Sequence, residues 1–212
     1  RPEYQKLGII RKRFPDVPII ALTATADDPT RKDIVKGLGF TEQDLFVSSF
    51  DRPNIRYTVE AKDQPRRQLL RMIRERHAGE AGIIYCRSRK KVDDTAEWLR
   101  EEGIRAVPYH AGMASQQRTL NQQLFLREEG IVVVATIAFG MGIDKPNVRF
   151  VAHLDMPPSP QHYSQESGRA GRDGLPAEAW LCYGWSDVVL AQRRLAESEL
   201  DPIQRRISHH QI

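Results

Sequence analysis

Two arginines, Arg169 and Arg172, are the side chains of this sequence best suited to phosphate chemistry. They lie in the glycine-rich stretch Q-E-S-G-R-A-G-R-D-G, which follows an apolar run at 148–154. If this stretch is helical, the two guanidinium groups share one face of the helix, one turn apart. Each guanidinium presents a planar fork of N–H donors that matches phosphate oxygens. The pair therefore predicts a phosphate-binding site, with a surface cluster of ion pairs as the alternative.

A second candidate site follows the apolar run at 131–135, which is short and β-branched and is predicted to be a buried strand. Thr136 ends this run, and Gly140 and Gly142 follow it. Glycines allow a backbone to approach a phosphate closely. The loop therefore favours binding of a phosphate chain through its backbone N–H groups.

A regular alternation of strand-like and helix-like segments positions these loops. The predicted strands are 81–86, 104–109, 131–135, 148–154 and 178–183, and the predicted helices are 65–77, 91–102, 116–128 and 187–199. This alternation indicates βαβ units and a parallel sheet flanked by helices, which is an α/β fold. Right-handed crossovers place the loops after the strands at the carboxyl edge of such a sheet. The loops concerned are 87–89, 110–113, 136–140 and the approach to 164–174.

Several polar residues and glycines are thus predicted to gather at that edge and to hold a nucleic-acid backbone. They are Arg87, Ser88, His110, Gly112, Thr136 and Lys145. Hydroxyls, cations and exposed N–H groups position a phosphate chain without reading its sequence. For each residue alone a capped turn is the alternative, and their convergence on one edge favours binding.

One of the predicted helices has a recognisable start and an apolar side. Ser115 is placed as the N-cap of the helix at 116–128. Leu120, Leu124 and Phe125 are expected to be buried by this helix.

The N-terminal part of the chain has its own pattern. A short helix is predicted within 1–14 and another at 29–38. Between them, P-I-I-A-L at 18–22 is predicted to be a buried strand that delivers Thr23 and Thr25 at its carboxyl end. Two further strand-like runs lie within 45–59, and the domain boundary is placed near residue 50 between them.

Two long stretches carry a resemblance to a known family. A-F-G-M-G-I-D-K-P-N-V-R-F-V-A-H and Y-S-Q-E-S-G-R-A-G-R-D-G resemble motifs V and VI of the superfamily 2 helicases, specifically of the RecQ DNA helicases. T-A-T at 23–25 resembles motif III. The resemblance implies a RecA-like fold of the P-loop NTPase type. It implies that 1–50 is the end of a first helicase lobe, 51–200 the second lobe, and 201–212 the start of a following region.

The resemblance also implies roles for particular residues. Arg172 is expected to be an arginine finger in ATP hydrolysis, with Arg169 coupling the two lobes. The residues expected to assist at the ATP cleft are Gln165, Asp144, Gly142, Thr23 and Thr25. Motifs IV and V are expected to hold the DNA strand. The implied activity is that of an ATP-dependent DNA helicase that moves 3′ to 5′ on single-stranded and partly duplex DNA, in repair and recombination, in the bacterial cytoplasm with the nucleoid.

Two elements of a complete motor do not occur in these 212 residues: the P-loop pattern G-x-x-x-x-G-K-[ST] and a D-E-A-H box. By resemblance, ATP and Mg²⁺ are expected to be bound mainly by an upstream lobe, and zinc only by a downstream region. The chain alone is therefore expected neither to hydrolyse ATP nor to unwind DNA.

Two other functions remain as alternatives. The first is the lobe of an RNA-directed superfamily 2 motor. Against it, the sequence reads Q-E-S-G-R-A-G-R where DEAD-box proteins usually show H-R-I-G-R-T-G-R. The second is a non-catalytic nucleic-acid-binding module, which does not need a pair of arginine fingers.

Composition sets weaker limits. The formal net charge is +4, a mild excess that is compatible with nucleic acid. Cys86 and Cys182 lie in apolar runs and are predicted to be reduced, buried thiols, and no C-x-x-C pattern predicts a zinc site. His209 and His210 could form a metal site, but a frayed terminus is the favoured interpretation of this pair. No apolar run approaches the roughly 18 residues of a membrane span, so no membrane partner is expected.

Overall fold

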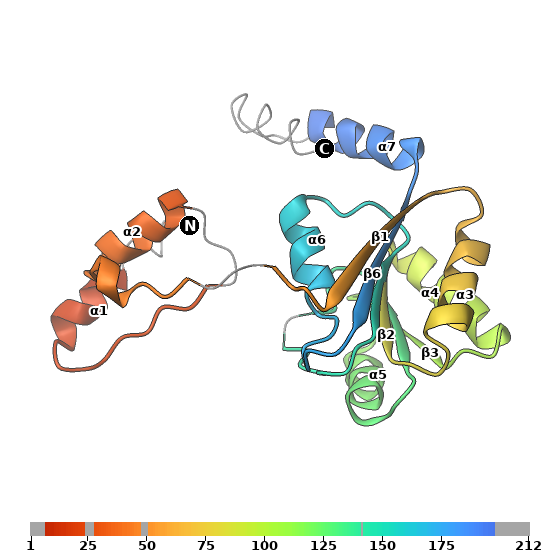
Figure 1. Ribbon diagram of the computed structural model, residues 1–212, viewed down its shortest axis with the longest axis horizontal. Coiled ribbons are helices and arrows are strands. Elements are labelled where there is room, and N and C mark those ends of the chain that lie inside the picture. The colour runs from red at the N-terminus through yellow and green to blue at the C-terminus, as the bar shows by residue number, and fades with distance from the viewer. Residues whose placement is uncertain (1–6, 24–27, 48–50, 141, 198–212) are drawn as a thin grey trace. The chain divides into compact units, whose positions relative to one another are not determined.

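The computed structural model describes residues 7–23, 28–47, 51–140 and 142–197 (Figure 1). The chain divides into two compact units, Arg1–Asp51 and Arg52–Ile212. No helix in the described residues combines the length and the apolar character that a bilayer crossing requires.

The first unit contains helix α1 (Gly8–Arg13), helix α2 (Asp28–Leu38) and a short 3₁₀ turn η2 (Glu42–Asp44). The guanidinium of Arg11 joins the two helices by donating hydrogen bonds to the carbonyls of Leu38 and Gly39, at 3.0 and 2.8 Å. None of the described residues of this unit is buried. The unit therefore has little core of its own.

The strand predicted at 18–22 is wrong. Residues 18–23 have no regular structure, and the side chains of Ile20 and Leu22 are 81% and 92% exposed. A parallel strand needs neighbours to bond its N–H and C=O groups, and the described part of this unit offers none. Residues 45–47 likewise form no strand, whereas 48–50 lie outside the described residues.

The second unit is built on a six-stranded sheet with the order β1-β6-β5-β2-β4-β3, in which every neighbouring pair is parallel. The strands are β1 (Ile55–Ala61), β2 (Gly82–Tyr85), β3 (Ala106–Tyr109), β4 (Val132–Ala135), β5 (Phe150–His153) and β6 (Ala177–Tyr183). The predicted parallel α/β sheet is thus confirmed. The four residues of β2, β4 and β5 are buried throughout, as expected for central strands covered on both faces.

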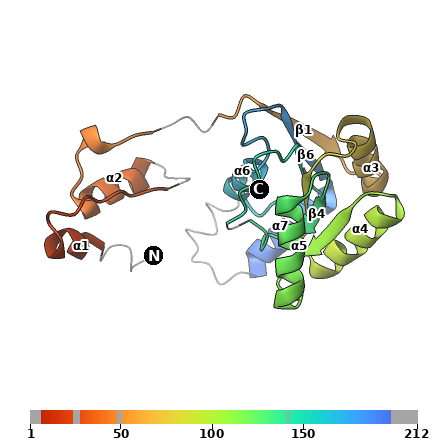
Figure 2. The same ribbon diagram turned by 90° about the horizontal axis from the view of Figure 1, so that it is seen from below.

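Helices cover both faces of the sheet (Figures 1 and 2). They are α3 (Pro65–Arg76), α4 (Arg89–Glu101), α5 (Ser115–Arg127) and α6 (Pro160–Ser167), whereas α7 (Trp185–Glu197) follows β6 and lies beyond the end of that strand. Leu69 of α3 and Leu99 of α4 pack with Ile84 in one core cluster, whereas Phe125 of α5 packs with Ile83 in the other. Because successive strand residues face opposite sides, two neighbouring isoleucines serve two separate cores.

Helix α5 differs in detail from its prediction. Phe125 is buried as expected, but Leu120 is 53% exposed and Leu124 is only half-buried. Asn121 takes the inward position instead, and its Nδ2 donates a 2.7 Å hydrogen bond to the carbonyl of Pro108. The N-cap is Ala114, one residue earlier than predicted. At the contact between α5 and β3, the buried position is thus taken by Asn121, which has a backbone partner, and not by the predicted Leu120.

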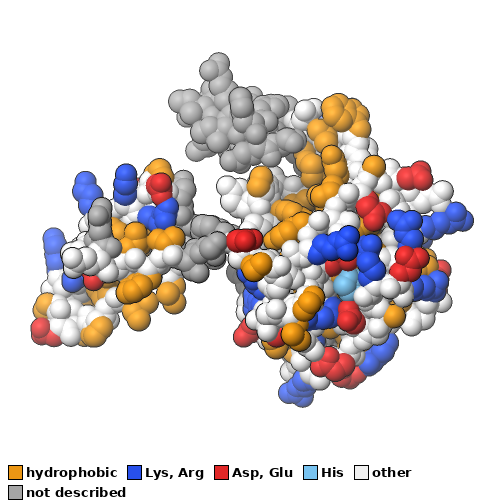
Figure 3. Space-filling view, viewed as in Figure 1, with side chains coloured by type: hydrophobic (Ala, Val, Ile, Leu, Met, Phe, Trp, Pro, Cys, Tyr) orange, Lys and Arg blue, Asp and Glu red, His pale blue; other side chains and the backbone are white. Residues whose placement is uncertain are grey.

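Apolar side chains are exposed at the β1 side of the sheet. Tyr57 and Val59 on β1 are 51% and 58% exposed, and Trp185 at the start of α7 is 76% exposed (Figure 3). The two cysteines, in contrast, are buried free thiols, as predicted. On the outer strand β1, Ile55 is the only residue buried in the core. Residues 201–212, predicted to begin a following region, and the pair His209 and His210 lie outside the described residues.

Candidate nucleotide and nucleic-acid sites

The predicted nucleic-acid residues that follow β2, β3 and β4 do meet at the carboxyl edge of the sheet. Arg87 and Ser88 follow β2, His110 and Gly112 follow β3, and Thr136 follows β4. The backbone N–H of Thr136 donates to the carbonyl of the last β3 residue at 3.2 Å, which ties two of these loops together. The edge thus brings together three loops that carry the predicted polar residues and glycine.

The loop after β2 is fixed by four polar contacts. Ser88 is the N-cap of α4, and its hydroxyl accepts a hydrogen bond from the N–H of Lys91 at 3.2 Å. The carboxylate of Asp155, which follows β5, accepts the N–H of Arg87 at 2.9 Å and the ammonium of Lys91 at 2.7 Å. The guanidinium of Arg87 reaches the carbonyl of Met156 at 3.4 Å. The first turn of α4 is therefore held at the sheet edge, where a helix N-terminus attracts anions.

The loop after β3 is organised by a buried histidine. His110 Nε2 lies 3.0 Å from the carboxylate of Asp93 on α4, and its Nδ1 accepts the N–H of Gly112 at 3.1 Å. These contacts assign the proton to Nε2. A Cβ on Gly112 would lie 3.0 Å from the side chain of Arg89, so this loop and α4 touch. His110 positions the loop, and Arg89, which was not singled out from the sequence, lies beside it.

The described part of the segment after β4 leads from the carboxyl edge to the amino edge. Near its start, the hydroxyl of Tyr85 donates to the carbonyl of Phe139 at 2.9 Å. Near its end, Lys145 is buried, with its ammonium 3.2 Å from the carbonyl of Glu128 and over the ring of Phe125. Glu128 precedes β4, so Lys145 lies at the opposite edge from the nucleic-acid candidates. The prediction that Lys145 joins them is wrong, because the loop has already crossed the sheet face.

The two arginines of the phosphate motif are not on a helix. Helix α6 ends at Ser167, and Arg169 and Arg172 lie in the turns that follow, around Gly171, which has φ +56°. The turn is not at the carboxyl edge either, because α6 runs back along the sheet. The N–H of Gly171 donates to the carbonyl of Val148, two residues before β5 begins. The helical presentation predicted from the spacing is therefore corrected to a tight turn near the amino edge.

Both guanidinium groups bind the loop that follows β4. Arg169 Nη1 donates to the carbonyl of Gly140 at 2.5 Å, and a Cβ on that glycine would lie 2.3 Å from the same guanidinium. Arg172 Nη1 donates to the carbonyl of Ile143 at 2.9 Å and to the carboxylate of Asp144 at 2.7 Å. The carboxylate of Asp144 is 86% exposed, so Arg172 is held at the surface of the unit.

The other cleft candidates are placed as follows. Gln165 is exposed on α6, and Gly142 is exposed with φ +77° in the loop that binds the arginines. Thr23 is exposed in the first unit, and Thr25 lies outside the described residues. The structure thus brings Gly142 and Asp144 together with the arginine pair.

Comparison with known proteins identifies this arrangement. The sequence matches the family described as the helicase conserved C-terminal domain over residues 64–174, which is more than half of the chain. The chain belongs to this helicase family.

Its relatives within the family are RecQ helicases. It is 53% identical to the ATP-dependent DNA helicase RecQ of Haemophilus influenzae over 212 residues, which are all of this chain and 34% of that protein. It is 44% identical to the RecQ-like DNA helicase BLM of Xenopus laevis, over 95% of this chain and 15% of that protein. The resemblance to RecQ helicases is confirmed. The chain spans about a third of the length of the bacterial relative.

A solved structure with a similar fold supports the fold class. Domain 2 of the DEAD-box helicase Mss116p, bound to an RNA duplex, superimposes with a TM-score of 0.55 at 20% identity, covering 69% of this chain and 60% of that one. The predicted RecA-like sheet of this helicase domain is thereby confirmed.

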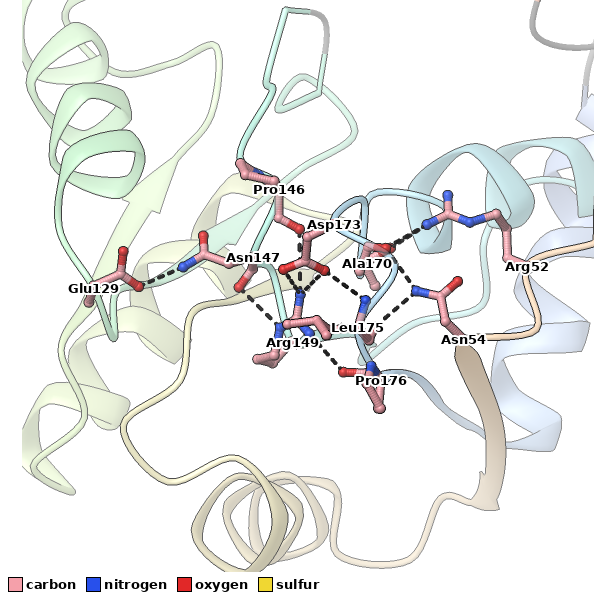
Figure 4. A network of polar contacts seen from close by, with 11 residues as sticks. Arg52, Asn54, Glu129, Pro146, Asn147, Arg149, Ala170, Asp173, Leu175 and Pro176 are labelled. Carbon is pink, nitrogen blue, oxygen red and sulfur yellow. Dashed lines mark hydrogen bonds and ion pairs between the residues drawn. The ribbon is translucent and has the colours of Figure 1, made fainter.

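The helicase domain also contains an anchor for the arginine turn that sequence reasoning missed (Figure 4). Arg52 and Asn54, which precede β1, donate to carbonyls of the turn, and Arg149 binds the carboxylate of Asp173 through two contacts of 2.6 and 2.7 Å. The hydrogen bond from Arg149 holds the pKa of Asp173 below its usual value. The sequence showed Arg52 and Asn54 only as part of a joint, because their partners lie more than 100 positions away.

A buried pair holds α6 of the helicase domain against the sheet. His153, the last residue of β5, contacts Glu166 of α6 through Nε2 at 2.7 Å, and its ring stacks on that of Tyr85. Neither residue was singled out from the sequence. A histidine within an apolar run is typical of a core residue, and here it orients the helix that leads to the arginine turn.

Proposed function

We propose that this chain is the second motor lobe of an ATP-dependent DNA helicase of the RecQ type that moves 3′ to 5′. One observation carries the proposal. The two arginines of the phosphate motif come from a single turn and bind the same loop, and that loop begins at the edge where the nucleic-acid candidates gather. A phosphate site and a nucleic-acid site are thus connected by one segment.

At the nucleotide, Arg172 acts as the finger and Arg169 supports it. Both guanidinium groups are already directed toward oxygen atoms, the carbonyls of Gly140 and Ile143 and the carboxylate of Asp144. The γ-phosphate of ATP is a more highly charged acceptor, and stabilising its charge during transfer is worth roughly 10³ to 10⁵ in rate in other systems. Gly142 lies in the loop that both guanidinium groups bind, and Gln165 is exposed on α6, which leads into the turn.

Mg²⁺ is the metal that such a reaction uses to neutralise the phosphate oxygens. No group of three or more His, Cys, Asp or Glu in the described part of the chain is arranged to hold a metal ion. The proposal therefore assigns to this lobe the arginines, and to an upstream lobe the P-loop, the metal and most of the ATP contacts. Zinc has no site among these described residues and belongs to the proposal only for a downstream region.

At the nucleic acid, the carboxyl-edge loops hold the phosphate chain of a single strand, including the strand of a partly duplex substrate. Ser88 and Thr136 offer hydroxyls, Arg87 offers charge, and His110 keeps Gly112 and its backbone in place. Contacts of this kind fix the position of a strand without reading its sequence. A helicase that acts in repair and recombination, in the bacterial cytoplasm with the nucleoid, needs that indifference to sequence.

The decisive experiment is a chimera in which residues 1–212 replace the matching third of Haemophilus influenzae RecQ. We expect ATP hydrolysis that is stimulated by single-stranded DNA and that falls on the order of 10³-fold in Arg172→Ala. Arg127→Ala, which removes an exposed arginine at the end of α5, is the matched control and should retain full activity. The isolated chain with Mg²⁺ and ATP should show no turnover.

Three results would contradict the proposal. A folded chimera without DNA-stimulated turnover, or turnover unaffected by Arg172→Ala, would favour a nucleic-acid-binding module. Stimulation by single-stranded RNA in preference to DNA of the same sequence would favour an RNA-directed motor.

A further inference from the structure

The turn that carries Arg169 and Arg172 is hydrogen-bonded by two side chains from the first residues of the second unit. Arg52 is the first residue of that unit, and its guanidinium donates to three carbonyls of the turn: those of Gly168 at 3.2 Å, Ala170 at 3.1 Å and Gly171 at 2.8 Å. Asn54 Nδ2 adds bonds to the carbonyls of Gly171 and Leu175, at 2.8 and 2.9 Å (Figure 4).

These carbonyls need partners because of where they lie. Gly168 is the C-cap of α6, and Ala170 and Gly171 lie past the end of the helix, so α6 has no N–H groups to offer these carbonyls. A guanidinium is always charged and presents its donors in a fixed fork, so one side chain can satisfy several carbonyls at once. Arg52 therefore fixes the direction in which the chain leaves α6.

The anchor leaves no room for a side chain at position 171 of the turn. Gly171 has φ +56°, and a Cβ there would lie 2.5 Å from Asn54 Nδ2 and 2.8 Å from the carbonyl oxygen of Leu175. Its N–H donates to the carbonyl of Val148 at 2.8 Å. Gly171 sits directly between Ala170 and Arg172, so any shift at the anchor moves the neighbouring guanidinium.

We propose that Arg52 and Asn54 are positioning residues for the arginine finger, acting on ATP hydrolysis through Arg172 without touching the nucleotide. This inference rests on the proposed motor function and deepens it. It assigns a positioning role in catalysis to the residues just before β1, which are not part of the carboxyl-edge loops.

The test uses the RecQ chimera described above, with single-stranded DNA in excess. Arg52→Ala should lower kcat for ATP hydrolysis by on the order of 100-fold, the cost of misplacing a catalytic group by about 1 Å. The KM for ATP and the affinity for single-stranded DNA should change less than about 3-fold, because the substrate contacts are elsewhere. Arg56→Ala, which removes an exposed arginine of β1, is the matched control and should behave as the unmodified chimera.

A double-mutant cycle separates positioning from a general loss of structure. If Arg52 acts through Arg172, adding Arg52→Ala to Arg172→Ala should lower turnover by no more than about 3-fold beyond the single variant. Gly171→Ala perturbs the same anchor from the turn side and should give the same drop in kcat with KM preserved. Hydrogen exchange should quicken at 168–175 in Arg52→Ala and stay unchanged in β4.

The outcomes distinguish the two proposals. Normal turnover in Arg52→Ala while Arg172→Ala is inactive would overturn the positioning role and leave the motor function standing. Losses that multiply in the double variant would also overturn it, because they would show that Arg52 acts apart from the finger. A folded parent chimera without DNA-stimulated turnover would instead refute the motor function on which the inference rests.

Discussion

At the scale of single residues, Gly140 and Gly82 are expected to differ in what a substitution changes: ATP turnover for Gly140 and folding stability for Gly82. A Cβ on Gly140 would lie 2.3 Å from the guanidinium of Arg169, whereas a Cβ on Gly82 would lie 2.1 Å from the ring of the buried Phe150. A guanidinium at the end of a flexible side chain can move aside, but a ring packed in the core cannot. We predict that Gly140→Ala lowers ATP turnover in the RecQ chimera at least 10-fold while shifting the free energy of unfolding by less than about 1 kcal/mol.

Gly82→Ala should show the opposite behaviour. Overpacking a filled core costs about 1–3 kcal/mol or more, so its unfolding midpoint in urea should fall clearly below that of the parent. Gly37→Ala in α2, where a Cβ meets nothing within 4 Å and Ala favours a helix over Gly, is the control and should not lower the midpoint. Equal destabilisation by Gly140→Ala and Gly82→Ala would show that Gly140 is a packing residue.

Sequence reasoning singled out candidate site residues but did not predict their surroundings. Arg169 and Arg172 stood out by type and spacing, but their helical presentation was wrong, because Gly168 and Gly171 end the helix and open a turn. Lys145 was assigned to the nucleic-acid edge because a lysine in a Gly- and Pro-rich loop looks the same whether it is exposed or buried. The path of the loop across the sheet decides whether this lysine is exposed or buried. Contacts of Phe139 at one end and Val148 at the other set that path.

At the scale of elements, the attachment of α7 depends on a partly buried ion pair. Lys62, which follows β1, donates to the carboxylate of Asp187 at 2.7 Å, and that carboxylate also accepts the N–H of Gly184 at 3.0 Å. Removing the charge of Asp187 leaves Lys62 with only the more distant carboxylate of Asp155, at 3.8 Å. We predict that Asp187→Asn costs about 2 kcal/mol of unfolding free energy and quickens hydrogen exchange in α7.

The pH dependence of this effect has a definite sign. Burial raises the pKa of Asp187, but hydrogen bonds from Lys62 and Gly184 lower it more, so its pKa lies below the ordinary value. Its stabilisation is therefore full above about pH 4, the ordinary pKa of Asp, and is lost as the pH falls through the lowered pKa. The difference between the parent and Asp187→Asn should shrink in acid. Asp94→Asn, which breaks an exposed pair on α4, should cost less than about 0.5 kcal/mol at any pH.

The helices and strands were predictable where the local sequence pattern alone determines the secondary structure. The β-branched runs that became β2, β4 and β5 are buried on both faces, and such runs form strands in any parallel sheet. The failures at 18–22 and 45–47 have the same apolar character but no neighbouring strand in the described residues of their unit. Strand formation depends on a partner that the local sequence does not contain, whereas the helices α1 and α2 satisfy their own backbone and were predicted.

At the scale of the whole molecule, the two thiols report on the integrity of the second unit. Burial raises the pKa of Cys86 to about 12, and it also raises the pKa of Cys182, so neither is an effective nucleophile in the folded state. We predict that a maleimide labels both cysteines only when the unit unfolds, at one common rate that rises with urea. Rapid labelling of either cysteine in native buffer would show that its strand opens independently.

The two units should also differ in their resistance to local opening. Every described residue of the first unit is at least partly exposed, whereas Ile83, Val134 and Val151 are at most 1% exposed in the second. Local stability follows buried apolar contact, so the free energy of opening should be close to zero in the first unit and close to the global value in the central strands. We therefore predict that amides of α2 exchange within seconds to minutes in the isolated chain, whereas those of β2, β4 and β5 persist on the order of 10³-fold longer or more. Exchange as slow at 18–22 as at 131–135 would contradict this, because it would require partners for residues 18–22 that the described part of the first unit does not provide.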